Sequence, residues 1–177
     1  MNETNRRRTK QLAVSAMLCA IGVILMMLGA TVQVLDLSVA ALASLLCIYA
    51  VIELGGAYPW LIWLVTSILS LLLLPQKTPA VFYALFLGYY PILKSIFEKL
   101  PRTVTLLCKL LTFHAALAVI YLTLRLFFPD TLETVGTNWF LAVIYLLALA
   151  CFLVYDFALT RLISTYLFRF RKRFRIK

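Results

Sequence analysis

Apolar segments of about 20 residues, joined by very short polar links, are the feature that most restricts how this chain can fold. Residues 11–35 contain no charged side chain at all. Hydrophobic residues make up 64% of the 177 residues and charged residues only 14%, so the chain cannot cover itself with a polar, water-facing surface. Because one membrane span uses about 20 residues, there is room for several spans but not for a soluble domain beside them. The sequence predicts an integral membrane protein with one membrane domain.

Glycine, proline and short polar stretches divide the apolar sequence into about six predicted spans. Long uninterrupted runs favour helices, because a barrel would show short segments of alternating hydrophobicity instead. The predicted fold is therefore an all-α bundle of about six transmembrane helices. The second span is the shortest, so five spans is the alternative count. The expected spans are residues 11–32, 38–54, 58–74, 79–97, 103–128 and 138–168.

Clusters of basic residues predict the orientation. One cluster precedes the first span, Lys99 and Arg102 lie between the fourth and fifth spans, and six basic residues follow the last span. With six spans all three clusters lie on one side, which the positive-inside bias identifies as the cytoplasm. A five-span count would separate the termini and break this agreement. The prediction is a basic cytoplasmic N-terminus (residues 1–10), a transmembrane domain (residues 11–168) and a basic cytoplasmic tail (residues 169–177).

The net charge of +10 is interpreted as topology together with attraction to anionic lipids. A basic residue beside a span gains roughly 1 kcal/mol at an anionic surface. The tail "RFRKRFRIK" interleaves phenylalanine with arginine, which suits an amphipathic extension in the membrane interface. Nucleic-acid binding is the weaker interpretation, and we expect none.

Motifs typical of enzymes and motors are absent from the sequence. There is no phosphate-binding loop, no H-E-x-x-H motif and no paired cysteine ligand set. All four cysteines fall inside predicted spans and are expected to be reduced, buried side chains. His114 lies in the middle of the fifth span. It is interpreted as a hydrogen-bonded packing or pocket residue, and a role as metal ligand or proton carrier is the weaker alternative. We expect a protein that is not an enzyme and needs no cofactor or metal.

Polar and aromatic residues gather at the ends of the predicted spans that face outward. A small-molecule pocket needs mostly apolar walls with a few placed polar groups, and these residues supply such groups. Ordinary interfacial anchoring by tyrosine, tryptophan and arginine is the alternative. The candidate substrate-binding residues, with His114 included, are Gln33, Asp36, Lys77, Tyr83, His114, Arg125, Asn138 and Trp139.

Ionisable residues also occur near the cytoplasmic ends of the spans, where each must face protein, water or a partner. Lys94 and Glu98 are four residues apart on one helix and are expected to pair. The set is interpreted as ion pairs anchoring helix ends, or as contacts to a partner. Its members are Glu53, Lys94, Glu98, Lys109, Asp156 and Arg161.

The fourth span contains Gly88 and Pro91 in "LFLGYYPILK". Proline removes a backbone donor and clashes with the preceding turn, so a kink or break is expected there. Broken membrane helices occur where they line a cavity or pack on protein.

Small side chains occupy one face of the first span. Ala13, Ala16 and Ala20 recur at three- and four-residue spacing near its cytoplasmic end. Small residues let a second helix approach closely, which drives helix association in lipid. The face either packs on another helix of this chain or docks a second protein.

The first span, "TKQLAVSAMLCAIGVIL" with Ala16-x-x-x-Ala20 after a basic N-terminus, resembles the start of the substrate-binding S subunits of energy-coupling-factor vitamin transporters. Members of that family have six helices and an Ala-x-x-x-Ala motif in the first. The resemblance implies docking of Ala16 and Ala20 on a transmembrane coupling subunit, with two ATPase subunits supplying energy. It also implies an outward-open pocket for a vitamin or related micronutrient, and a location in the bacterial cytoplasmic membrane.

Two functions from different classes remain open at this point. The first is a membrane-embedded binding subunit that captures a small solute and depends on partner ATPases. The second is a scaffold without a ligand, similar in size and span count to the cell-shape factor MreD, that uses the same small face and basic tail to assemble with envelope proteins. A membrane-embedded enzyme using His114 or Asp156 is a third, weaker possibility.

Overall fold

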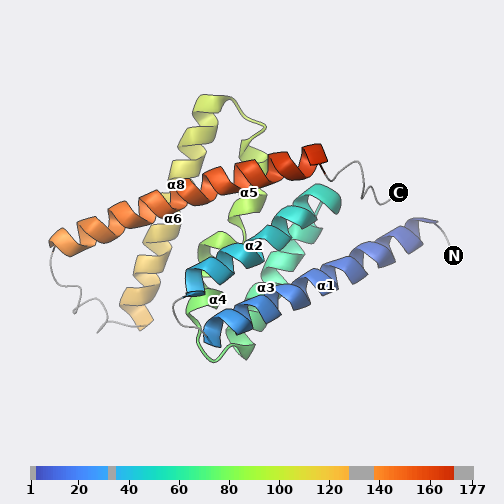
Figure 1. Ribbon diagram of the computed structural model, residues 1–177, viewed down its shortest axis with the longest axis horizontal. Coiled ribbons are helices and arrows are strands. Elements are labelled where there is room, and N and C mark those ends of the chain that lie inside the picture. Colours follow the sequence, from blue (N-terminus) through green and yellow to red (C-terminus); the bar gives the residue numbers. More distant parts are fainter. Residues whose placement is uncertain (1–2, 32–34, 128–137, 170–177) are drawn as a thin grey trace. The chain divides into compact units, whose positions relative to one another are not determined.

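The computed structural model describes residues 3–31, 35–127 and 138–169, and throughout these ranges the regular structure is helical, with no strand. This confirms the all-α prediction. The helices form two compact units (Figure 1). Unit 1 comprises the described residues up to Arg102, and unit 2 comprises those from Thr103 onward. Each unit is considered by itself.

Unit 1 contains α1 (Glu3–Thr31), α2 (Asp36–Glu53), α3 (Tyr58–Leu73), α4 (Thr78–Phe82), the π-helix η2 (Tyr83–Leu87) and α5 (Tyr90–Phe97). Unit 2 consists of the two long helices α6 (Arg102–Phe127) and α8 (Asn138–Arg169).

Among the described residues, five helical segments are long and apolar enough to cross a membrane: Asn5–Thr31, Asp36–Glu53, Thr78–Phe97, Thr103–Thr123 and Leu141–Tyr166. The chain is therefore described as a multi-span membrane protein.

The short apolar helix is α3, not α2 as the sequence suggested. It has 16 residues, which give a length of about 24 Å against a hydrocarbon core of about 30 Å. It ends because Leu74 precedes Pro75 and takes an extended conformation, with ψ 134°. At its other end Gly55 and Gly56 have φ of +63° and +59°, a turn that separates α3 from α2.

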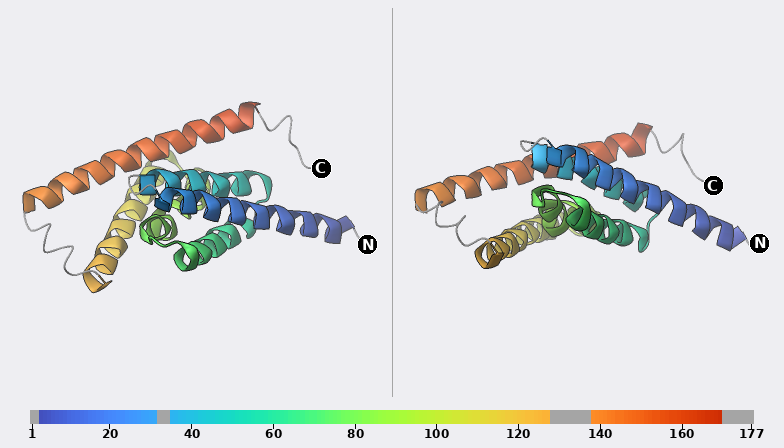
Figure 2. Two further views of the ribbon diagram at one scale, coloured as in Figure 1. Left: turned by 60° about the horizontal axis from the view of Figure 1, so that its bottom comes forward. Right: turned by 90° about the horizontal axis from the view of Figure 1, so that it is seen from below.

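Unit 1 is built around close contacts of α1 with α2 and α3 (Figure 2). The inward face of α1 carries Leu18, Val23 and Met26, at the spacing of one helical stripe. At Gly29 an added Cβ would lie 2.6 Å from a methyl carbon of Val39. Only glycine therefore permits this approach of α1 to α2.

The fourth predicted span is interrupted, as expected. The Gly88 amide donates to the Tyr83 carbonyl at 2.8 Å, a π-type bond, and α5 starts again with Pro91 in its first turn. The Trp63 indole packs on the break and donates to the Ala84 carbonyl at 3.2 Å. A Cβ at Gly88 would lie 2.5 Å from Cδ1 of Trp63, so the interruption requires both proline and glycine.

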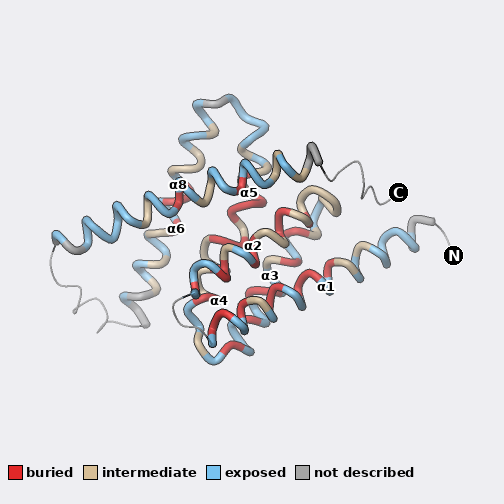
Figure 3. The backbone as a smooth tube through the Cα atoms, in the orientation of Figure 1, coloured by how far each residue is buried: buried red, intermediate tan, exposed pale blue. Residues whose placement is uncertain are grey.

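Unit 2 is held together where its two helices cross. The rings of Phe113 and Phe152 stack with centroids 4.7 Å apart, and both residues are buried. Elsewhere the described side chains of α6 and α8 are mostly exposed and apolar (Figure 3), which is the surface expected for contact with lipid or with protein.

Candidate functional site

The predicted pocket residues of unit 1 have different surroundings. Asp36 begins α2 and is 9% exposed, with its Oδ1 buried and without a hydrogen-bond partner. Lys77 is exposed and donates from Nζ to the Leu74 carbonyl at 2.6 Å. Tyr83 is buried at the start of η2, with its hydroxyl 3.2 Å from the Cys47 thiol. Gln33 lies outside the described residues.

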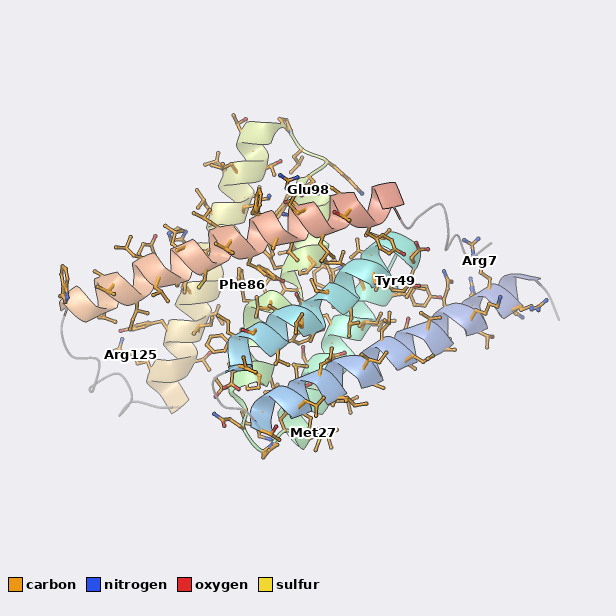
Figure 4. All side chains as sticks on the ribbon, in the orientation of Figure 1. Arg7, Met27, Tyr49, Phe86, Glu98 and Arg125 are labelled. Carbon is orange, nitrogen blue, oxygen red and sulfur yellow. The ribbon has the colours of Figure 1, made fainter. Side chains whose placement is uncertain are left out.

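The predicted residues of unit 2 belong to the helices α6 and α8. Arg125 is exposed near the C-terminal end of α6 (Figure 4), and Trp139 is 79% exposed. Asn138 is the first residue of α8, and its side chain lies outside the described part of the structure. A role for these residues in solute binding stays a prediction.

His114 is a hydrogen-bonded packing residue on α6. Its Nδ1 lies 2.8 Å from the Leu110 carbonyl and its Nε2 lies 2.9 Å from the Tyr145 hydroxyl on α8. Because a carbonyl only accepts, Nδ1 is the donor to Leu110, and Nε2 makes the contact with the tyrosine hydroxyl. His114 thus links the two helices of unit 2.

Two ion pairs are formed among the charged residues that the sequence places near the ends of the spans. Lys94 is fully buried and lies 3.6 Å from Glu98, as the spacing predicts. Lys109 on α6 pairs with Asp156 on α8 at 2.8 Å. The Arg161 guanidinium, which the sequence grouped with Asp156, lies over the Phe157 ring at 5.4 Å instead.

A polar cluster inside unit 1 was not predicted from the sequence. Four elements contribute to it: α1, α2, α3 and η2. The α3 residues Thr66 and Ser70 are 1% and 0% exposed, and neither hydroxyl has a hydrogen-bond partner of acceptable geometry. Thr66 adjoins the Cys19 thiol and the Tyr83 hydroxyl. We call this set, with Cys47, the unit 1 polar cluster.

Thr66 and Ser70 differ from other hydroxyl residues in the described helices. Ser67 on the same helix donates to the Trp63 carbonyl at 2.7 Å, the usual bond to the preceding turn. Thr112 and Thr123 make the same kind of bond. For Thr66 the corresponding carbonyl is that of Ile62, and the Cys19 thiol points at it from 3.8 Å. Neither Thr66 nor Ser70 makes this bond to its preceding turn, and both side chains are buried in unit 1.

The chemistry of the unit 1 polar cluster is that of recognition by hydrogen bonds. Hydroxyls donate and accept, a thiol does so weakly, and a buried polar group without a partner is destabilising by about 1–3 kcal/mol. Among the described residues no group of three or more histidine, cysteine, aspartate or glutamate side chains could hold a metal ion. The sequence signal was present as Thr66-x-x-x-Ser70 in "VTSILS", a spacing that places two hydroxyls on one helix face.

The small face of α1 is outward. Ala13, Ala16 and Ala20 are exposed, while Cys19 and Val23 point into unit 1. The three alanines therefore do not pack within unit 1, and both alternatives from the sequence, another helix of this chain or a second protein, stay open. Larger exposed side chains, including Met17 and Ile24, border the three alanines. We call Ala13, Ala16 and Ala20 the alanine strip.

Comparison with known proteins gives no match to a family model, to a curated protein or to a solved structure.

Proposed function

We propose that this chain is the membrane-embedded binding subunit of a solute uptake system, driven by partner ATPase subunits. It captures a small solute, of the vitamin or micronutrient class, at the outer face of the bacterial cytoplasmic membrane. The family resemblance of the first helix motivates this assignment, and the structure supplies independent support for a binding role.

The main supporting observation is the buried Ser70 hydroxyl on α3, which has no hydrogen-bond partner and lies one turn from the Thr66 hydroxyl. A scaffold gains nothing from a buried Ser70 hydroxyl without a partner, since such a group lowers stability. A binding protein does gain, because the bound solute supplies the missing hydrogen bonds. The interrupted helix beside them, with Tyr83 at its π-turn, is typical of functional sites in membrane helices.

The exposure of the alanine strip supports the proposal that α1 docks on a second protein. Ala13, Ala16 and Ala20 would allow a helix of a transmembrane coupling subunit to approach α1 closely. In this proposal the solute site and the docking face lie on opposite sides of one helix, since α1 presents Cys19 to the unit 1 polar cluster and its alanines outward.

The proposed topology has six crossings with both termini in the cytoplasm, as the basic clusters indicate. It requires α3 to cross as a short helix, with local thinning of the bilayer, which is a modest energetic penalty per ångström of mismatch.

The test is affinity purification of the tagged full chain from its native membrane in mild detergent, with mass spectrometry of proteins and small molecules. A coupling subunit, an ATPase pair and a retained solute are expected. Envelope-assembly proteins without a solute would overturn the proposal in favour of the scaffold.

Substitutions on α1 distinguish the partner-docking surface from the solute site. The double variant Ala16→Trp/Ala20→Trp should lose the partner proteins and keep the solute, because bulk blocks helix approach. Ile21→Trp, at an exposed position about 100° further round α1, is the matched control and should keep both. Equal loss in the two variants would contradict docking at the alanine strip.

A further inference from the structure

The buried carboxylate of Asp36 bears on the charge of the solute, provided that the proposed binding function holds. Asp36 is 9% exposed at the first position of α2, and its Oδ1 has no hydrogen-bond partner. The helix dipole at an N-terminus favours a negative charge, which explains why the position tolerates aspartate. It does not supply a donor to this oxygen.

The helix itself does not need this side chain. The N-cap of α2 is Leu35, and no side chain forms a capping hydrogen bond there. A capping role, the ordinary reason for aspartate at a helix start, is therefore not the explanation of Asp36.

The basic residue that follows α3, at the same end of unit 1 as the start of α2, is engaged elsewhere. Lys77 follows α3, and its Nζ lies 2.6 Å from the Leu74 carbonyl and 3.4 Å from the Leu72 carbonyl. It therefore caps the C-terminal end of α3, in keeping with the negative end of the helix dipole.

Asp36 and Ser70 lie toward the same end of unit 1. The helices α2 and α3 are joined by a four-residue turn and run antiparallel, so the start of α2 and the end of α3 meet at one end (Figures 1 and 2). Ser70 lies one turn before the end of α3, and Thr66 lies about 6 Å deeper along the same face. An acceptor-only carboxylate thus stands at the end, with two hydroxyls behind it.

We infer that the solute carries a positively charged nitrogen that binds Asp36, and a polar group that reaches Ser70 and Thr66. An ionised carboxylate accepts hydrogen bonds only, and its strongest partners are charged N–H donors. The hydroxyls both donate and accept, so they take a hydroxyl, amide or carbonyl group. An anionic solute would meet Asp36 with like charge and is excluded by this arrangement.

The test measures ligand-dependent thermal unfolding of the purified full chain in detergent with three probes of matched size: benzylammonium chloride, benzyl alcohol and sodium benzoate. Ionic strength is held equal with sodium chloride. Benzylammonium should raise the unfolding temperature most and benzoate least. Asp36→Asn should weaken benzylammonium binding by about 10-fold or more, since a charge-assisted bond is lost, and leave benzyl alcohol unchanged.

Lys10→Gln is the control for a change of charge, because Lys10 is exposed on α1 and has no part in the proposed site. It should keep the preference for benzylammonium. Equal or stronger stabilisation by benzoate, a preference that survives in Asp36→Asn, or no shift with any of the three probes would overturn the inference. A retained solute without a cationic nitrogen would overturn it while leaving the proposed function intact, whereas loss of both solute and ATPase partners would refute the proposed function itself.

Discussion

Removing the hydroxyl of Ser70 should make the protein more stable and less able to bind. Ser70 is fully buried and its Oγ has no partner, so the folded protein without solute bears a desolvation penalty of about 1–3 kcal/mol. Ser70→Ala removes that penalty and leaves almost the same volume, because alanine lacks only the oxygen. The expected gain is about 1 kcal/mol, which corresponds to an unfolding temperature about 2–4 °C higher for a chain of this length.

The assay is thermal unfolding of the full chain in detergent, after the retained solute has been washed out, together with mass spectrometry of the solute in unwashed samples. Ser67→Ala is the matched control on the same helix, because the Ser67 hydroxyl already donates to the Trp63 carbonyl at 2.7 Å. That variant should be neutral or slightly destabilised and should retain solute. If Ser70→Ala unfolds at a lower temperature than Ser67→Ala, the Ser70 hydroxyl has a partner in the folded protein and the reasoning fails.

Three further outcomes follow from the packing. Gly88→Ala should destabilise unit 1 by about 2 kcal/mol or more, measured by thermal unfolding, because the new Cβ overlaps the indole packed on the helix break. Asp156→Asn should destabilise the chain by about 2 kcal/mol, since Lys109 would lose its partner at 2.8 Å in the membrane; the double variant with Lys109→Gln should recover most of the loss in the same assay. The variant Ala16→Trp/Ala20→Trp should unfold at the wild-type temperature, because both alanines are exposed, while partner co-purification falls.

For each of these three predictions, a specific result would contradict the expected change in stability. Gly22→Ala is the control for Gly88, because its nearest contact would be 3.1 Å to a methyl of Thr66 and calls for a shift of only a few tenths of an ångström. Equal effects at the two glycines would mean that the break has room for a side chain. Additive effects of the two charge variants would show that the ion pair is not coupled. A large loss of stability in the tryptophan variant would mean that the alanine strip packs within the folded chain.

Patterns local in sequence predicted the helical fold, the interruption at Gly88 and Pro91, and the pairing of Lys94 with Glu98. Each depends on residues within one or two turns of a single helix, so no knowledge of neighbours is needed. The bounds of α2 and α3 lie within one or two residues of the predicted spans 38–54 and 58–74, because glycine and proline mark the turns on either side of α3.

Contacts between helices could not be predicted from the sequence. The partner of Asp156 is Lys109, which is 47 positions away, and nothing local selects it over Arg161. The unit 1 polar cluster depends on contacts between helices, such as that of the Cys19 thiol with the Ile62 carbonyl 43 positions away. Apolar periodicity is a poor guide here as well, because lipid-facing and protein-facing residues are both hydrophobic.

The continuity of α1 from Glu3 to Thr31 couples its basic start to its alanine strip. A helix of 29 residues is about 44 Å long, which exceeds the hydrocarbon thickness of about 30 Å. The exposed side chains of Arg6, Arg7 and Arg8 (Figure 4 labels Arg7) therefore extend from the same rigid rod as Ala16. Inserting one residue between the arginines and Ala16 would turn the alanine strip by about 100° relative to the arginines.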